Sequence, residues 1–498
     1  MFQRPKITIL LILISIFLGG YFSIISYVIP NPKNTNSTSL LSDEQKVWIK
    51  KYIFPYKLIS LHEETIDDLR ETIDDLRETT DGLRKTIDDL QKKLAHREKL
   101  LEIAKPIIRE LRPFVSELRK KEDGGDITTT ENIKKLSINK TLKKYELNSV
   151  FHAGINNLYP GSGYIDFYEN NIIVLSSRGI LAFKKNIEDT GENFQQIKNN
   201  INEFIGEDQF NKFRWFSLKD IFIFNNKVFV SYTEEIKEDC WNTSVIYGDM
   251  NYENIVFRKL FSPKECLLNV NDNIDKEFNA HQSGGRIISF DDNHILLSIG
   301  DYRSRNLAQD IKSVNGKIIK VNINNGNYEV ISMGHRNPQG LYFDKENNFI
   351  LETEHGPQGG DEVNLIEVNK INKDKIQNYG WPISSAGEHY GGKVERNETK
   401  YEKYPLYKSH SDHGFIEPLK SFVPSIGVSE IVKIGQNKYV VSSMHDKSLY
   451  FFELNKQKQI INLNRVEVFE RVRDLSFKNN QLLLFMEDTA SIGVLNLN

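Results

Sequence analysis

The feature that most constrains the fold is a β-hairpin pattern that the sequence repeats six times beyond residue 148. Each copy has an apolar strand, a short turn rich in Asn or Asp, and a second strand in which side chains alternate with a period of two. Repeats of about 40–50 residues or slightly more are typical of propeller blades. Residues 148–498 are therefore predicted to form an all-β, six-bladed propeller, with an extended loop at 352–425 in the longest interval. The copies begin at Ile165, Ile221, Ile287, Leu341, Ile431 and Leu475.

The open ends of these hairpins should share one face of the propeller. Residues that precede a first strand or follow a second strand then form a ring around the central axis. Arg forks bind carboxylates in a bidentate way, so a ring rich in Arg and His suits a small polyanionic ligand. The alternative is a charged rim that only contacts water. The residues placed on this ring are His281, Asp301, Arg336, Asn337, Glu354, His355, His445, Lys447, Arg471, Arg473 and Glu487.

An apolar segment lies near the start of the chain. Residues 7–29 contain no charged side chain, and about 20 apolar residues are enough for a helix to cross a bilayer. Arg4 and Lys6 precede the segment, so residues 1–6 are expected in the cytoplasm and everything after the segment outside it. The prediction is a single-pass anchor in the cytoplasmic membrane, with the propeller on the periplasmic or extracellular side. The alternative, a cleaved signal peptide, also exports the propeller.

A heptad repeat occupies residues 65–101, inside a predicted helical stalk at 43–120. Ile at one core position and Leu at the other favour a parallel two-stranded coiled coil, so the chain is predicted to form a homodimer. The alternative is a single amphipathic helix that lies on another surface. Residues 121–147, which include Gly124 and Gly125, are expected to be a linker. The core positions are Ile66, Ile73, Thr80, Ile87, Leu94 and Leu101, with Leu69, Leu76, Leu83 and Leu90.

Charge and cysteine content narrow the choice of partners. The net charge of −3 gives no sign of a nucleic-acid partner. The two cysteines, Cys240 and Cys266, are predicted to form one disulfide in an oxidising compartment, the alternative being two unpaired thiols. The sequence has no P-loop, no dinucleotide fingerprint, no HExxH motif and no nucleophile elbow.

Four motifs stand in order at the open ends of the hairpins. They are HQSGGR at 281–286 with SIGD at 298–301, GHRNPQGL at 334–341, ETEHGPQGGDEVN at 352–364 with NYGWP at 378–382, and RVRD at 471–474. Together they resemble the pyrroloquinoline quinone (PQQ)-dependent soluble aldose dehydrogenases of the glucose/sorbosone dehydrogenase family. The resemblance implies a six-bladed propeller that uses PQQ and Ca²⁺ to oxidise an aldose-type sugar.

The resemblance also implies a role for each matching residue. His281 would be the general base that takes the proton of the sugar C1 hydroxyl as hydride passes to the quinone, and Asp301 would hold its imidazole. Calcium would act as a Lewis acid on the quinone. The implied PQQ ligands are Arg336, Asn337, Gln339, His445, Lys447, Arg471 and Arg473. The implied calcium ligands are the carbonyls of Gly356 and Pro357, with Glu362 and Tyr379 at a further calcium site.

The chain departs from the family pattern at LSSRG (175–179), FRWFSLKD (213–220) and MHDKS (444–448). The expected function is nevertheless sugar oxidation outside the cytoplasm by a membrane-anchored enzyme. Its electrons would pass to a membrane quinone or a small electron carrier. One alternative is a propeller that binds a glycan or a protein without turnover. Another is a structural oligomer in which the coiled coil is the functional part.

Overall fold

The chain divides into two compact units, residues 1–111 and 112–498, which are described separately. The predicted anchor at 7–29 lies outside the described residues, and no helix among those residues is both long enough and apolar enough to span a membrane. The computed structural model describes residues 44, 68–97, 99–100, 125–151, 162–212, 215–269, 277–372, 375–390 and 398–497.

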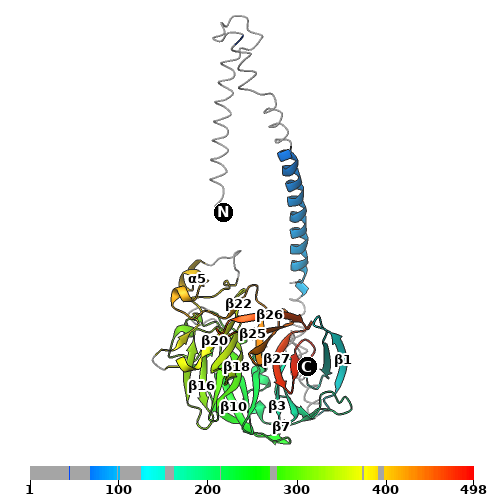
Figure 1. Cartoon of the computed structure of the whole chain (residues 1–498), viewed down its shortest axis with the longest axis vertical. Helices are drawn as coiled ribbons and strands as arrows, with labels where there is room; N and C mark the ends of the chain where they lie inside the picture. The colour runs from blue at the N-terminus through cyan, green and yellow to red at the C-terminus, as the bar shows by residue number, and fades with distance from the viewer. Residues whose placement is uncertain are drawn as a thin grey trace. The chain divides into compact units, whose positions relative to one another are not determined.

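The first unit contains a long helix over residues 68–97, with 99–100 also helical (Figure 1). This confirms the helical part of the predicted stalk over these residues. Within the described part of this helix, the Ile and Leu side chains of the heptad core are about half exposed, from 48% for Ile73 to 60% for Leu76. An apolar stripe of this kind suits a second helix, and the coiled-coil dimer stays a prediction.

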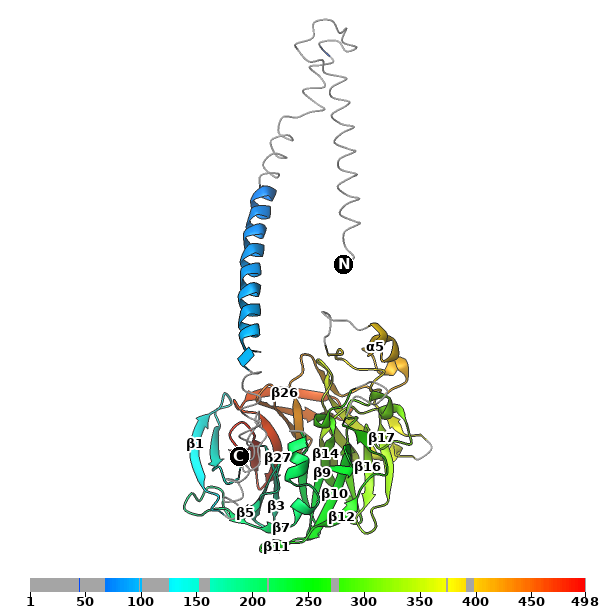
Figure 2. The same ribbon diagram turned by 180° about the vertical axis from the view of Figure 1, so that it is seen from behind.

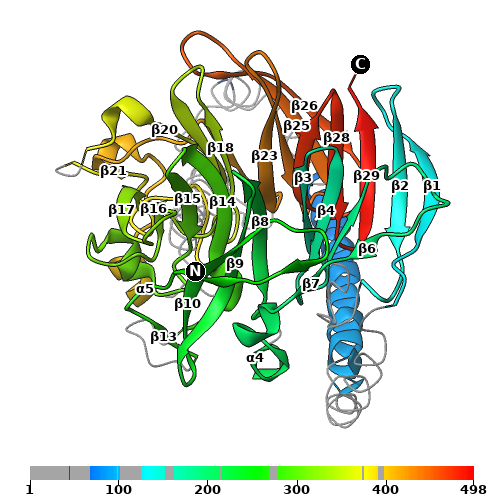
Figure 3. The same ribbon diagram turned by 90° about the horizontal axis from the view of Figure 1, so that it is seen from below.

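The second unit is a propeller in which all six predicted hairpins are present. The first strands of the hairpins contact one another in a closed order, β3–β8–β14–β18–β23–β27–β3, and β8, β14 and β18 lie side by side in Figure 3. The hairpins pair β3 (Gly163–Tyr168) with β4 (Asn171–Ser176), β8 (Leu218–Phe224) with β9 (Lys227–Lys237), β14 (Gly284–Asp291) with β15 (His294–Ile299), β18 (Pro338–Asp344) with β19 (Phe349–Glu354), β23 (Val428–Gly435) with β24 (Lys438–Ser443), and β27 (Val472–Lys478) with β28 (Gln481–Met486).

Further strands extend each hairpin outward into a sheet of four or five strands. They are β5 (Leu181–Lys184), β6 (Gln195–Gln196), β10 (Cys240–Asp249), β12 (Arg258–Phe261), β13 (Leu267–Leu268), β16 (Lys317–Asn322), β17 (Tyr328–Met333), β20 (Asp361–Glu367), β21 (Gln377–Asn378), β22 (Lys420–Phe422), β25 (Ser448–Leu454), β26 (Ile460–Glu467) and β29 (Ser491–Asn496). The remaining elements are the parallel pair β7 (Lys198–Asn199) and β11 (Asn254–Ile255), the helices α4 (Glu207–Lys212) and α5 (Glu398–Lys403), and short 3₁₀ turns.

Two strands from before the predicted propeller complete its last blade. β1 (Thr129–Lys135) and β2 (Thr141–Leu147) extend the sheet in the order β1-β2-β29-β28-β27, with β1 at its outer edge (Figure 2). The expected linker at 121–147 is therefore wrong over these residues, and the boundary at 148 is too late. The strand was missed because six of the seven residues of β1 are exposed, which removes the alternation of apolar side chains.

The long interval at 352–425 is also more ordered than the expected extended loop. It contains β20, β21 and β22 as well as α5. The predicted disulfide is confirmed, because Cys240 and Cys266 are bonded with their Cα atoms 5.3 Å apart.

Buried carboxylates join neighbouring blades around the central channel. Asp474 accepts the backbone N–H of Ile165 at 2.8 Å. Asp166 and Asp220 repeat this contact in the next two blades, accepting the backbone N–H groups of Ile223 at 2.6 Å and Ile287 at 2.7 Å. On these three innermost strands, β27, β3 and β8, a single carboxylate thus satisfies a donor of the next blade, which fixes how these blades meet.

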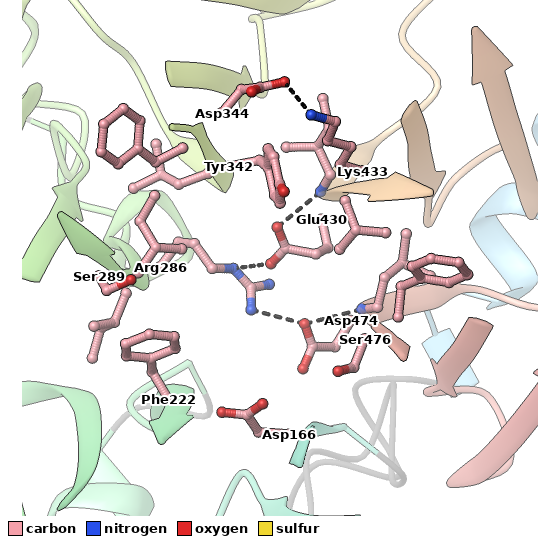
Figure 4. A pocket seen from close by; sticks show the side chains of 18 of the residues that line it. Asp166, Phe222, Arg286, Ser289, Tyr342, Asp344, Glu430, Lys433, Asp474 and Ser476 are labelled. Atoms are coloured by element: carbon pink, nitrogen blue, oxygen red, sulfur yellow. Dashed lines mark hydrogen bonds and ion pairs between the residues drawn. The ribbon is translucent and has the colours of Figure 1, made fainter. Parts of the chain in front are cut away.

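Arg286 on β14 fills the middle of the channel (Figure 4). Its Nη1 atom contacts Asp220 at 2.7 Å and Asp474 at 2.8 Å, and its Nε atom contacts Glu430 and donates to the Gln339 carbonyl. The channel on the side of the hairpin turns has a volume of about 1000 Å³. Burial raises the pKa of Asp166 to about 7 and that of Glu430 to about 8, against the opposing charge of Arg286.

Candidate active site

His281 stands in a short turn directly before the first strand of blade three. Residues Ala280–Gln282 form a 3₁₀ turn, and the N-cap Asn279 accepts the backbone N–H of His281 at 2.8 Å. The imidazole lies against the indole of Trp215, with ring centroids 4.1 Å apart. His281 is exposed, so a fixed imidazole is open to a ligand on this face.

Asp301 is fully buried where β15 ends. Its Oδ2 atom accepts the Trp381 Nε1–H at 2.8 Å, and its Oδ1 atom accepts the Arg303 backbone N–H at 2.8 Å. Burial raises the pKa of Asp301 although Arg336 opposes the shift. The next residue, Tyr302, donates its backbone N–H to the Gln282 carbonyl at 2.9 Å, which places Asp301 close to the turn that carries His281. The predicted contact of Asp301 with the imidazole stays a prediction.

Arg336 lies between the ends of hairpins three and four. Its Nη1 atom donates to the His355 carbonyl at 2.9 Å and its Nη2 atom to the Tyr390 hydroxyl at 3.1 Å. The guanidinium also lies 5.4 Å from the centroid of the Trp381 ring, within cation–π range. When the Gln282 side-chain amide is oriented so that its oxygen and its nitrogen both have partners, the oxygen accepts from Arg336 Nη2 at 2.9 Å and the nitrogen donates to Asp301 Oδ1 at 2.9 Å. Gln282, the residue after His281, thereby connects Asp301 with Arg336.

Asn337, Gln339 and His355 continue the ring from blade four to blade five. Asn337 Oδ1 accepts the Gly284 N–H at 3.2 Å and a Gln339 Nε2–H at 3.0 Å. His355 Nε2 donates to the Val428 carbonyl at 2.6 Å, so its Nδ1 atom is free to accept from Asn337 Nδ2 at 3.3 Å. Burial lowers the pKa of His355, which keeps this imidazole neutral.

Arg471 and Arg473 on the last blade share one carboxylate. The Nε atom of Arg471 lies 2.7 Å from Glu487 Oε1, and that of Arg473 lies 2.8 Å from Glu487 Oε2. Burial opposes the ionisation of Glu487, but the two arginines hold its pKa below the usual value. Arg473 Nη1 also donates to Gln339 Oε1 at 3.4 Å, so blades four and six meet here. We call this end of the channel, at the open ends of the hairpins, the mouth.

His445 and Lys447 stand in the loop between β24 and β25. His445 is exposed. Lys447 Nζ pairs with Asp488 Oδ2 at 2.7 Å, and the same oxygen accepts the Arg471 N–H at 3.3 Å. The loop thus lies beside the arginines, as predicted from hairpin topology, but Lys447 is engaged with a carboxylate of the protein.

The predicted calcium ligands fall into two places. Gly356 packs so tightly that an added Cβ would lie 2.1 Å from the Gly360 carbonyl oxygen, and its N–H donates to Asp361 at 3.1 Å. This loop sets the Gly356 and Pro357 backbone next to His355 on the ring. A peptide segment without side-chain bulk can present carbonyl oxygens, the ligands that calcium prefers.

An imidazole contacts both Glu362 and Tyr379, and the further calcium site at these two residues stays a prediction. His410 Nδ1 donates to the Tyr379 carbonyl at 2.9 Å, and its Nε2 atom lies 3.5 Å from Glu362 Oε1. The sequence motif could not reveal this arrangement, since His410 comes from a separate loop beyond the motif.

Three residues of the mouth were missed by the sequence interpretation. Trp215 and Lys219 belong to FRWFSLKD, which precedes hairpin two and therefore should have been assigned to the same ring. Lys219 Nζ donates to the carbonyls of Trp215 at 3.1 Å and Ala280 at 3.4 Å. Burial, together with Arg473 and Arg178, lowers the pKa of Lys219 to about 7. Tyr390, the third, follows NYGWP and contacts Arg336, which lowers the pKa of its hydroxyl.

The chain matches a known protein family and several known proteins. The model of the Glucose / Sorbosone dehydrogenase family matches residues 216–495. An uncharacterised protein of Synechocystis sp. is 29% identical over 223 residues, which cover 39% of this chain and 50% of that protein. The aldose sugar dehydrogenase YliI of Escherichia coli is 23% identical over 289 residues, 54% of this chain and 71% of that protein.

The fold is shared with solved structures. The soluble aldose sugar dehydrogenase of Escherichia coli, in its apo form, superimposes with a TM-score of 0.51 at 20% identity, covering 67% of this chain and 94% of that one.

Proposed function

Since the chain belongs to the glucose/sorbosone dehydrogenase family, we propose that it oxidises an aldose-type sugar with PQQ as the hydride acceptor and Ca²⁺ beside it. The observation that carries the proposal is the convergence of an exposed imidazole and several basic side chains at one mouth of the ring. His281 comes from blade three, Arg336 from blade four, and Arg471 and Arg473 from the last blade.

The donor set of this mouth fits PQQ. The cofactor carries three carboxylates and two quinone oxygens, which are acceptors, and the mouth presents guanidinium, amide and ammonium donors. Arg forks bind carboxylates with two parallel hydrogen bonds. We assign PQQ binding to Arg336, Asn337, Gln339, His445, Lys447, Arg471 and Arg473, with Lys219 added from the structure. When bound, PQQ would supply the quinone that accepts hydride.

The chain's own catalytic group in this proposal is His281. Its neutral imidazole would take the proton of the C1 hydroxyl, a step in which a positioned base contributes about 10²–10⁴-fold. Trp215 packs against the ring and limits its rotation, which is the orientation that such a base needs. The carbonyls of Gly356 and Pro357 would hold calcium, whose chemistry there is to polarise the quinone oxygen.

The remaining parts of the chain would place this reaction at a membrane surface. We propose that residues 7–29 anchor the protein in the cytoplasmic membrane and that the propeller lies outside it. The stalk helix would pair with that of a second copy and hold the propeller near a membrane quinone or small electron carrier. A disulfide such as Cys240–Cys266 persists in oxidising compartments, in line with an exported propeller.

One observation favours the alternative of a propeller that binds a glycan or protein without turnover. Arg471 and Arg473 already contact Glu487, and Lys447 already contacts Asp488. PQQ would have to bind in addition to these pairs or displace them. A family member that no longer binds PQQ would keep the fold, and its basic side chains would pair with carboxylates of the protein itself, as these three do.

Cofactor titration separates the two functions. Calorimetry of the purified protein with PQQ and Ca²⁺ should show binding, and a panel of aldoses should then reduce an artificial electron acceptor. His281→Ala should abolish turnover while the protein still binds PQQ. A protein that binds no PQQ at micromolar concentration is not this dehydrogenase, and sugar or glycan binding would then be measured directly.

A further inference from the structure

Behind the mouth, three carboxylates meet inside the sheet formed by β18, β19 and β20. Glu352, Glu354 and Glu362 surround the side-chain amide of Asn364 (strands in Figure 1). The Asn364 Nδ2 atom lies 3.0 Å from Glu352 Oε2, 3.1 Å from Glu354 Oε1 and 3.3 Å from Glu362 Oε2. None of these four residues is more than 5% exposed. An amide nitrogen has only two hydrogens, so it cannot satisfy three carboxylates fully.

An imidazole completes the cluster. His335 Nδ1 lies 3.3 Å from Glu354 Oε1 and 3.8 Å from Glu352 Oε2. The three ligand atoms of His335, Glu352 and Glu354 all lie within 4.8 Å of one another. The other ring nitrogen, Nε2, is 2.8 Å from the Ser332 hydroxyl. A hydrogen bond at the far nitrogen fixes the tautomer and ring orientation of histidines that bind metals.

The cluster has more negative charge than the protein around it balances. In the described part of the chain, the ion-pair partners of Glu352, Glu354 and Glu362 are histidines, His335 and His410. Two outcomes can relieve this repulsion: protons on the carboxylates, or a bound cation.

Unpartnered polar atoms in the cluster point to a cation. Glu352 Oε1, Asn364 Oδ1 and His410 Nε2 are buried without a hydrogen-bond partner. Each is a lone-pair donor or can become one, and His410 Nε2 faces Glu362 Oε1 at 3.5 Å. If the Asn364 amide turned by half a rotation, its orphaned oxygen would face the carboxylates. That rotation is unfavourable against bare carboxylates and favourable around a positive ion.

We propose that His335, Glu352, Glu354 and Asn364 bind a divalent first-row transition ion of the Mn²⁺ or Zn²⁺ type. One imidazole nitrogen with carboxylate and amide oxygens is a donor set that such ions accept, whereas calcium takes oxygen ligands. The ion is structural. Glu354 Oε2 accepts the backbone N–H of Arg336, so the ion fixes the segment that carries a predicted cofactor ligand without itself touching the cofactor.

The test uses the purified protein without PQQ, so its outcome is independent of the proposed dehydrogenase activity. The protein is freed of metal with a chelator and titrated with Mn²⁺ or Zn²⁺, and metal content and melting temperature are measured. We expect one ion per chain at this site and a higher melting temperature, because free ion at 100 times Kd shifts the folding equilibrium about 100-fold. Pulsed electron paramagnetic resonance of bound Mn²⁺ should show coupling to an imidazole ¹⁴N.

Glu352→Gln removes one ligand charge at nearly constant volume and should weaken metal binding at least tenfold, on the order of the losses seen when outer-shell partners are changed. Glu346→Gln, on the exposed turn of the same hairpin, is the matched control and should bind as the parent does. If Glu352→Gln fails to fold, the parent titration decides alone. Absence of Mn²⁺ and Zn²⁺ binding at millimolar concentration, or binding of Ca²⁺ only, would overturn the proposal.

Discussion

In the middle of the central channel the Arg286 guanidinium contacts three carboxylates and a carbonyl, whereas at the mouth Arg471 and Arg473 share the single carboxylate of Glu487. Both places carry buried charge. In the middle the protein surrounds one cation with several anions, and at the mouth it places several cations around one anion.

This difference separates a structural ion-pair cluster from a ligand site. We call the cluster of Arg286 with Asp220, Glu430 and Asp474 the brace. The guanidinium of Arg286 contacts carboxylates of neighbouring blades, so removing this side chain would leave those buried carboxylates without their ion-pair partner. The arginines at the mouth, with side chains 16% and 19% exposed, carry positive charge in excess of Glu487. A polyanion can add to the second group but not to the first. Buried charge alone therefore does not indicate a ligand site. An excess of positive charge at the open mouth does indicate a site for an anion.

The largest expected effect comes from removing the brace. Arg286→Met leaves Asp220, Glu430 and Asp474 buried without their cation, which should cost about 3–5 kcal/mol of the free energy of unfolding. Urea unfolding followed by fluorescence measures it. Arg471→Met is the matched change at the mouth, where Glu487 keeps Arg473, and should cost much less. Equal losses in the two variants would remove the distinction between the middle of the channel and its mouth.

The brace should also make stability depend on pH. Burial raises the pKa of Asp166 from 3.8 to about 7 in the folded protein, so the folded state binds a proton more tightly than the unfolded chain. The stability from this group is complete below pH 4 and is lost as pH rises through 7, by an amount on the order of 2–4 kcal/mol. Urea midpoints at several pH values measure the fall, and Asp166→Asn should flatten it. An unchanged slope in that variant would assign the pH dependence elsewhere.

At the mouth, the same kind of substitution should affect ligand affinity more than folding. Arg471→Met removes charge-assisted hydrogen bonds to a PQQ carboxylate, each worth about 1.5–3 kcal/mol, or roughly 10–100-fold in Kd. Calorimetry with PQQ measures the change. Arg258→Met is the control, because Arg258 lies on β12, the edge strand of its sheet, and pairs with Asp249 away from the residues assigned to PQQ. If both variants bind PQQ like the parent, the mouth arginines are not cofactor ligands.

The sequence predicted the brace and the mouth to different extents. All six hairpins followed from alternation of period two, whereas β1 was missed because its side chains are exposed and polar. The motif residues His281 and Arg336 were placed correctly on one ring by hairpin topology. Lys219 precedes hairpin two, so hairpin topology places it on the ring as well, and only the desolvation that lowers its pKa has no local sequence signal. His410 was missed because it comes from a separate loop beyond the motif.

The smallest expected effect concerns the Lys219 ammonium at the mouth, whose charge a change of pH can remove. Burial lowers the pKa of Lys219 to about 7, so in the free protein this ammonium is lost as pH rises from 6 to 8. Affinity for the anionic quinone should fall over that window by at most about 1 kcal/mol, the range of a partly solvated ion pair. Calorimetric titrations with PQQ at pH 6 and pH 8 measure the fall, and Lys219→Gln should bind equally at both. Asp166, which lines the channel on the side of the hairpin turns, gains charge over the same window. A fall that persists in Lys219→Gln but not in Asp166→Asn would therefore assign the effect to the channel instead of the mouth.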